Sequence, residues 1–246
     1  MAAFAPDIIT HIGAFPLTNT FMDTLLVDAG LLGGTYYLTK HIKTIPNFFQ
    51  NTVEIVIEGF YDLGESVAGA NIIRIFPWFM SFFLFILVAN WSGLIPGIGT
   101  FGFYETVDGQ KELIPFFRNT TSDLNTTFGL ALISLVATHT LAVQAVGWKE
   151  YLSRYFSFNP VYLYVGFLEI IGEFTKIISL SFRLFGNIFA GEVVLSTISS
   201  IFAIIFPIPF MLLEIIVGLV QALVFSMLTM VFMSVLMTPH HAEEKH

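Results

Sequence analysis

The sequence predicts an all-α integral membrane protein, and three features of its 246 residues support this prediction. Charged residues make up only 11% of the chain, whereas a soluble domain of this length is normally about 25% charged. Hydrophobic residues make up 55%. Several uncharged runs are long enough to cross roughly 30 Å of hydrocarbon. The surplus apolar surface must therefore face lipid.

Charge and cysteine content narrow the functional classes. The net charge is −8, so nothing suggests nucleic acid as a partner. The sequence contains no Cys, which excludes disulfides, thiol catalysis and Cys-based metal sites. Residues 1–17 have no basic n-region and are not Arg-rich, so we expect neither a signal peptide nor a mitochondrial transit peptide.

The first expected membrane helix covers residues 17–39, where Asp23 and Asp28 weaken the apolar pattern. Residues 47–70 differ, because apolar side chains recur at helical spacing opposite four acidic ones. The apolar positions are Phe48, Phe49, Val53, Val56, Ile57, Phe60 and Leu63, and the acidic ones are Glu54, Glu58, Asp62 and Glu65. This amphipathic helix is too charged to cross a bilayer. We expect it to lie along the membrane surface or against a partner, with packing on the chain's own loops as the alternative.

Two uncharged runs, residues 75–96 and 124–148, are each long enough to cross the bilayer. Trp91 in the first run is expected at interfacial depth. His139 and Gln144 in the second run are expected to be packed polar residues rather than ligands. The remaining connections, residues 1–16, 97–123 and 149–159, are expected to be exposed lead-in or loop.

An apolar run over residues 160–206 would be about 70 Å long as a helix, more than twice what a perpendicular crossing needs. It forms either two spans with an unmarked turn or one long helix lying steeply in the membrane. The positive-inside rule favours one long helix, because a single crossing places six basic residues on one side and two on the other. The six are Lys40, Lys43, Arg74, Lys149, Arg154 and Lys245, and the two are Lys111 and Arg118. A turn at 206–210, a returning helix over 210–237 and a polar tail complete a single membrane domain, 1–246, with about five membrane helices and one amphipathic surface helix.

Arg183 lies near the middle of this long run, where an arginine is least expected. Burying a guanidinium at the bilayer centre costs about 3 kcal/mol on insertion scales, and arginine cannot lower that cost by losing its proton. At about 100° per residue, Glu169 and Asn187 lie on its face of the helix, and Glu192 lies opposite. Glu169 is about 21 Å away along the axis, which is too far for pairing. We therefore expect the partner of Arg183 on another subunit.

Glu214 and Gln221 are seven residues apart on the last helix and so lie one above the other on one face. Carboxylates in a membrane take and release protons or coordinate small cations, whereas a fixed arginine repels cations and attracts an anionic partner. The pattern is therefore typical of ion passage. A stand-alone ion channel or secondary transporter with buried carboxylates is the alternative, although no internal repeat of the transporter kind is visible.

Motifs for covalent chemistry are absent from the sequence. It shows no Gly-rich phosphate loop, nucleophile elbow or metal-ligand spacing. We therefore expect no catalytic residue, no metal site and no cofactor.

Residues 179–192, SLSFRLFGNIFAGE, resemble the signature of subunit a of F-type ATP synthases. Other stretches agree in order, namely HIGAFPLTNT (11–20), ANWSGLIP (89–96) and TSDLNTT (121–127). The resemblance spans nearly the whole chain. It implies an ion-translocating subunit of the H⁺-transporting ATP synthase complex that binds no nucleotide itself.

The resemblance further implies a stator beside a ring of c subunits, with two proton half-channels that couple proton flow to ring rotation and ATP synthesis. The b-subunit peripheral stalk and the remaining synthase subunits are the other implied partners. A bacterial plasma membrane is the expected location, with the C-terminus in the cytoplasm. The family's ion-translocating residues fall on Arg183, Asn187, Glu192, Glu214, Gln221 and Glu169. Members often carry His at one of positions 192 and 214, so Glu at both leaves proton or sodium coupling open.

Overall fold

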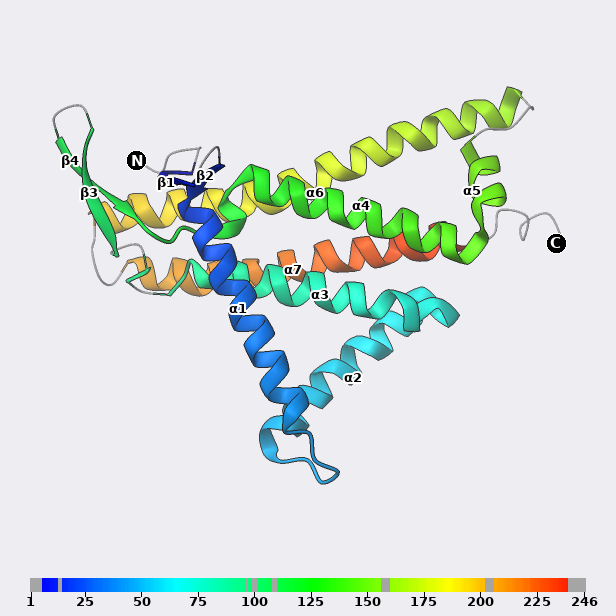
Figure 1. Cartoon of the computed structure of the whole chain (residues 1–246), viewed down its shortest axis with the longest axis horizontal. Helices are drawn as coiled ribbons and strands as arrows, with labels where there is room; N and C mark the ends of the chain where they lie inside the picture. The colour runs from blue at the N-terminus through cyan, green and yellow to red at the C-terminus, as the bar shows by residue number, and fades with distance from the viewer. Residues whose placement is uncertain are drawn as a thin grey trace. The chain divides into compact units, whose positions relative to one another are not determined.

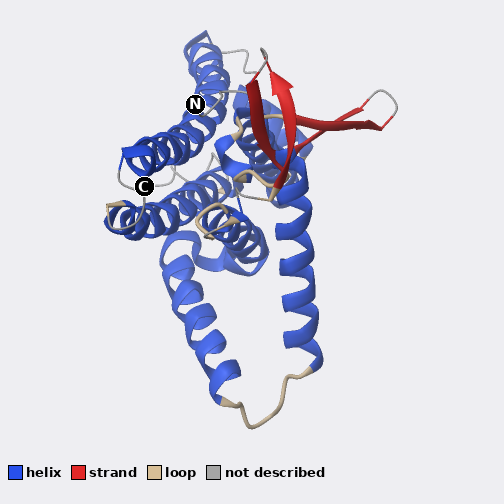
Figure 2. Cartoon of the chain, turned by 90° about the vertical axis from the view of Figure 1, so that its left-hand side faces the viewer, coloured by secondary structure: helices blue, strands red, loops and turns tan. Residues whose placement is uncertain are grey.

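The computed structural model describes residues 6–12, 15–95, 97–98, 101–107, 110–155, 160–201 and 206–238. Helices make up most of this part of the chain (Figure 1). They are α1 (Asn19–Lys40), α2 (Phe48–Ala68), α3 (Ile72–Ser92), α4 (Leu124–Val146), α5 (Trp148–Tyr155), α6 (Pro160–Ile201) and α7 (Pro207–Met237). Two antiparallel two-stranded hairpins and the 3₁₀ turns η1 (Gly69–Asn71) and η3 (Thr120–Ser122) complete the described elements (Figure 2).

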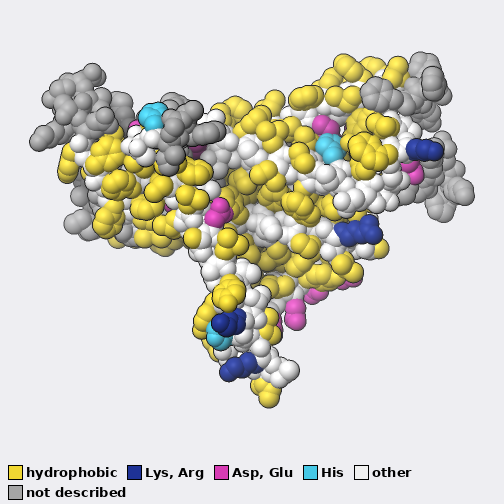
Figure 3. Space-filling model, viewed as in Figure 1, with side chains coloured by type: hydrophobic (Ala, Val, Ile, Leu, Met, Phe, Trp, Pro, Cys, Tyr) yellow, Lys and Arg dark blue, Asp and Glu magenta, His cyan; other side chains and the backbone are white. Residues whose placement is uncertain are grey.

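Four helical stretches within the described ranges are long and apolar enough to cross a membrane. They are Phe48–Ser92, Leu124–Val146, Leu163–Ile201 and Pro207–Met237. Hydrophobic side chains, yellow in Figure 3, cover most of the face in view. The predicted all-α, multi-pass membrane protein is thereby confirmed. Helix α1 is not among the four stretches, so the crossing of residues 17–39 stays a prediction.

Helix α6 runs without a break over 42 residues (Figure 1). The alternative of two spans separated by a turn is therefore wrong for Pro160–Ile201, while the number of crossings that α6 makes stays a prediction. Helix α7 begins at Pro207, earlier than the predicted start at residue 210. Proline is tolerated in a first helical turn, because the N–H that it lacks would have no partner there. Of the predicted cytoplasmic tail, residues 238–246, all but the first residue lie outside the described residues.

Both hairpins and α5 lie in segments where the sequence predicts a lead-in or loops. The strands are β1 (Ile8–Ile12), β2 (Phe15–Thr18), β3 (Gly102–Val107) and β4 (Gln110–Pro115). In the sequence, Asp108-Gly109 stands between β3 and β4, and an Asp-Gly pair is a strong signal for a two-residue hairpin turn. This signal could have predicted the second hairpin.

Local side-chain caps determine where α1 and α2 begin. Thr18 Oγ1 accepts a hydrogen bond from the Phe21 amide at 3.3 Å, and Asn47 Oδ1 accepts one from the Gln50 amide at 3.0 Å. Such caps satisfy N–H groups that have no partner in the first helical turn. Gly147, with φ of +89°, separates α4 from α5 in a backbone conformation that favours glycine.

The chain forms two compact units, each built from separated stretches of sequence. The first contains residues 1–41, 83–127 and 182–223, and the second contains residues 42–82, 128–181 and 224–246. Helices α3, α4, α6 and α7 each contribute one part to each unit. The single membrane domain stays a prediction.

The second unit has an apolar core to which α2, α3, α4 and α7 contribute. Its buried residues are Ala68, Ile72, Ile75, Phe79, Ala137, Leu141, Met230, Met233 and Met237. A Cβ at Gly64 of α2 would lie 2.7 Å from Ile72 Cδ1, so glycine permits the close approach of α2 here. The carboxyl-terminal half of α2 thus packs on helices of its own chain, whereas Phe48 and Phe49 at its start are exposed.

Candidate functional site

The first unit brings together two glutamates of the predicted site, one on α6 and one on α7. Glu214 is only 7% exposed, and its carboxylate packs against Gly191, the residue before Glu192. A Cβ at position 191 would lie 2.9 Å from the Glu214 carboxyl carbon, so the approach requires glycine. Glu192 and Glu214 are close enough for their negative charges to repel each other. Glu214 Oε2 is buried and has no hydrogen-bond partner among the described residues. Two such carboxylates can take up a proton or a small cation.

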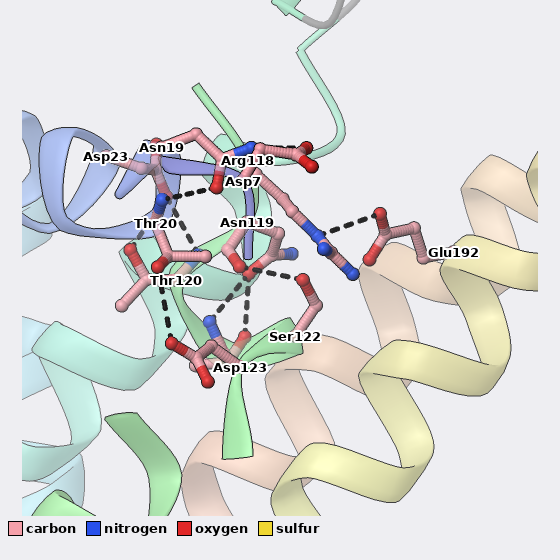
Figure 4. Close-up of polar contacts among 11 residues, drawn as sticks. Asp7, Asn19, Thr20, Asp23, Arg118, Asn119, Thr120, Ser122, Asp123 and Glu192 are labelled. Atoms are coloured by element: carbon pink, nitrogen blue, oxygen red, sulfur yellow. Dashed lines mark hydrogen bonds and ion pairs between the residues drawn. The ribbon is translucent and has the colours of Figure 1, made fainter. Parts of the chain in front are cut away.

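Arg118 is a member of this site that the sequence does not predict. Its Nε lies 3.4 Å from Glu192 Oε1, and its side chain is 8% exposed (Figure 4). From the sequence, Arg118 is predicted to be a charged loop residue outside the membrane. Its pairing could not be predicted, because Glu192 is distant along the chain. The ion pair offsets part of the cost of removing the Arg118 charge from water.

Asp23 lies at the centre of a buried polar network that joins α1, α3 and η3. Asp23 Oδ2 accepts hydrogen bonds from Ser92 Oγ at 2.9 Å, the Thr120 amide at 3.0 Å and Thr120 Oγ1 at 2.8 Å. Nearby, Thr20 Oγ1 donates to Asp123 Oδ2 at 3.3 Å. In the sequence Asp23 only weakens an apolar run, whereas in the structure it holds three elements together.

Asn90 and Trp91 attach the end of α3 to the part of α7 that carries Glu214. Asn90 Nδ2 donates to the Gly218 carbonyl at 2.9 Å, and Trp91 Nε1 donates to the Ile215 carbonyl at 3.2 Å. A Cβ at Gly218 would lie 3.1 Å from Asn90 Cβ, so the two helices are close at this point. These bonds fix the backbone of α7 within one turn of Glu214.

Arg183 and Asn187 lie one helical turn apart on the part of α6 in the first unit, and both side chains are exposed. Leu184 and Ile188, next to them in sequence, are each 1% exposed. One side of this segment therefore packs within the unit, and the other presents Arg183. Gln221 on α7 is half-buried.

Glu169 belongs to the second unit, whereas the other five residues of the predicted site belong to the first. Arg154 Nε donates to Glu169 Oε1 at 2.6 Å and thereby links α5 to α6. One turn further along α6, Lys176 Nζ donates to Glu173 Oε1 at 2.7 Å. Each of these carboxylates therefore has a basic partner in its own unit.

Metal ligands do not gather in the part of the chain that the structure describes, where no three His, Asp or Glu side chains form a group suited to a metal ion. The groups that the site offers are carboxylates, amides and a guanidinium. Of these groups, the carboxylates can bind and release protons or small cations.

A model of the family described as ATP synthase A chain matches residues 21–234. The chain belongs to this family. The ATP synthase subunit a of Moorella thermoacetica is 30% identical over 234 residues, which cover 95% of this chain and 97% of that relative. The motif at residues 179–192 predicted subunit a of an ATP synthase, and these matches confirm that family.

Proposed function

We propose that this chain is the stator subunit of a bacterial F-type ATP synthase, in which protons reach and leave a rotating ring of c subunits through two half-channels. The observation that carries the proposal is the arrangement of α6 and α7 in the first unit. Arg183 and Asn187 are exposed on α6, while Glu192 and Glu214 form a carboxylate site at the junction of α6 with α7. Membership of the ATP synthase A chain family supports this assignment.

The carboxylate site is the proposed inlet for protons. A proton that passes Glu192, Glu214 and Gln221 neutralises a carboxylate of the ring. A neutral carboxyl group can rotate into lipid without the desolvation cost of an ion. The unpartnered oxygen of Glu214 is suited to take up this proton, and Arg118 holds Glu192 in place.

Arg183 is the proposed partner of each ring carboxylate that returns from lipid. A guanidinium beside a carboxyl group favours the charged form and so promotes loss of its proton. The proton leaves through the second half-channel, which we place near Glu169. Since arginine keeps its own proton under physiological conditions, Arg183 also prevents protons from passing directly between the half-channels.

The proposed partners are the c ring, the b-subunit peripheral stalk and the remaining synthase subunits. The distribution of Lys and Arg supports a C-terminus in the cytoplasm. The stretch HIGAFPLTNT (11–20), similar to bacterial members of the family, supports a location in the bacterial plasma membrane. The exposed apolar residues at the start of α2, among them Phe48 and Phe49, suit the membrane surface or one of these partners.

Purification of the tagged chain from its native membrane in mild detergent tests this assignment. We expect it to purify together with a c ring and a peripheral ATPase, and the purified complex in liposomes to make ATP when a proton gradient is applied. A chain that migrates alone and conducts ions by itself in liposomes would instead be an autonomous channel or transporter. ATP synthesis driven by a sodium gradient alone would show that the coupling ion is sodium and not the proton.

Replacing Gly191 with Ala is expected to slow ATP-driven proton pumping by about tenfold or more, because proton-transfer groups act only when they are correctly placed. The new Cβ would occupy the space of the Glu214 carboxylate and displace it. Pumping is measured by fluorescence quenching in membrane vesicles, with the amount of assembled complex determined on the same samples.

Gly129→Ala is the matched control, because a Cβ on that helical glycine of α4 meets nothing within 4 Å. It should pump at the parental rate. Equal pumping by both variants would show that the position of the Glu214 carboxylate against Gly191 does not matter for transport.

A further inference from the structure

We propose that His139 is a proton-relay residue of the release path, acting with Tyr151 and Glu173 beside a cavity large enough to hold water. This inference rests on the proposed function and extends it to a helix, α4, that otherwise carries no charged residue between Leu124 and Val146. Three kinds of observation in the second unit support it: a cavity, a chain of contacts and a balance of charges.

A cavity of about 340 Å³ lies among α4, α5 and α6. Its polar lining comes from His139, Tyr151, Tyr155 and Glu173, and the rest of the lining is apolar. A buried water needs roughly 10–15 Å³ of such volume and two to four polar partners. The cavity therefore has room for water, and its four polar side chains can supply the partners that one water molecule needs.

Both ring nitrogens of His139 face groups that exchange protons. Nδ1 lies 2.9 Å from the Tyr151 hydroxyl, which is hydrogen-bonding distance, and Nε2 lies 3.7 Å from Glu173 Oε2. The second distance is longer than a direct hydrogen bond but within the range of an ion pair. The imidazole thus connects a carboxylate of α6 with a hydroxyl of α5.

Two ion pairs of the second unit lie close to His139. On α6, Lys176 lies 2.7 Å from Glu173. Glu169, also on α6, lies 2.6 Å from Arg154 of α5. Among the described residues, Tyr151 on α5 is a further titratable group in contact with the ring. Since each of these ion pairs is neutral with both partners charged, a proton gained by the neutral imidazole gives the cluster a net charge of +1.

The relay step conserves protons. A proton released on the Glu169 side of α6 binds the neutral imidazole, and the resulting imidazolium faces Glu173. Loss of a proton to water in the cavity returns the ring to its neutral form. One proton enters and one leaves, because either ring nitrogen of histidine can carry it. A buried histidine with a purely structural role would also have partners for its nitrogens, but it would not need a cavity beside the ring.

His139→Gln in the complete synthase, reconstituted in liposomes, tests the relay. Glutamine keeps a donor and an acceptor but does not titrate. We expect ATP synthesis to fall by about threefold or more, which is a modest share of the effect usual for a proton-transfer group. We also expect the rate to lose its dependence on pH on the release side between about pH 5 and 8, where imidazoles titrate. Added imidazole should restore part of the rate at that side.

His41→Gln, at an exposed histidine at the end of α1, is the control and should behave as the parent. An unchanged rate and pH profile in His139→Gln would overturn the relay. A slower rate with an unchanged pH profile and no imidazole rescue would also overturn it, since that result shows a structural role.

If His139→Gln does not assemble, Tyr151→Phe decides instead, because it removes only the hydroxyl in contact with Nδ1. The relay requires this variant to shift the pH profile, and an unchanged profile overturns it. Synthesis driven only by sodium would overturn it as well. Failure of the proposed function itself is recognised separately, by normal proton-driven synthesis in Arg183→Ala.

Discussion

Arg183→Ala is expected to abolish ATP synthesis driven by a proton gradient, while the complex still assembles. The side chain is exposed on α6, so its removal leaves no cavity in the packing of the first unit. The variant lacks the positive charge that promotes release of a proton from the ring carboxylate. It also lacks the barrier between the half-channels, so we expect a passive proton leak through the membrane sector. Synthesis and leak are measured on the same reconstituted complex.

Two further variants define what Arg183 contributes. Arg74→Ala removes another exposed arginine, at the start of α3, and should synthesise ATP at the parental rate. Arg183→Lys keeps a positive charge but loses the planar guanidinium, and a lysine in apolar surroundings gives up its proton readily. It should therefore lose most of the activity. Normal synthesis in Arg183→Ala would refute the proposed mechanism.

Glu214→Gln is expected to slow proton transport by about tenfold or more, because a group that transfers protons typically contributes about 10²- to 10⁴-fold to the rate of its step. The amide has nearly the same size, so the contact with Gly191 and the assembly of the complex should persist. It cannot take up and release a proton as the carboxylate does. Transport is measured as ATP-driven acidification of vesicles and as gradient-driven synthesis.

Glu58→Gln makes the same chemical change at an exposed position of α2 and should leave transport unchanged. Glu192→Gln should slow transport as well, and it additionally removes the charge paired with Arg118. Full activity in both Glu214→Gln and Glu192→Gln would place the inlet elsewhere in the chain.

The polar network around Asp23 suggests why the first unit keeps its carboxylates in place. Arg118 and Thr120 lie two residues apart in the connection from β4 to α4, and they contact Glu192 and Asp23 respectively (Figure 4). This short segment therefore links α1 with α6. A connection that the sequence predicts as a polar loop thus determines the surroundings of the carboxylate site.

The helices are predictable from the sequence because their signals are local. Uncharged runs of sufficient length predicted α3 and α4, and longer, mostly apolar runs predicted α6 and α7, all within a few residues of their ends. Helical spacing of apolar residues predicted α2. The motif at 179–192 predicted the family, which the match over residues 21–234 confirmed. The hairpins and α5 were not predicted, because they are short and lie in polar segments whose structure depends on turn geometry and neighbouring contacts.

The sequence by itself determined the all-α membrane class, the family and the position of the charge at Arg183, since each depends on composition or on residues close together in the chain. Only the tertiary structure decided the surroundings of the charges: Arg118 beside Glu192, Glu214 against Gly191, and His139 between Tyr151 and Glu173. The physical reason is that a buried polar group must find a partner. Which partner it finds depends on how helices distant in sequence pack together, and no local pattern of residues records that choice.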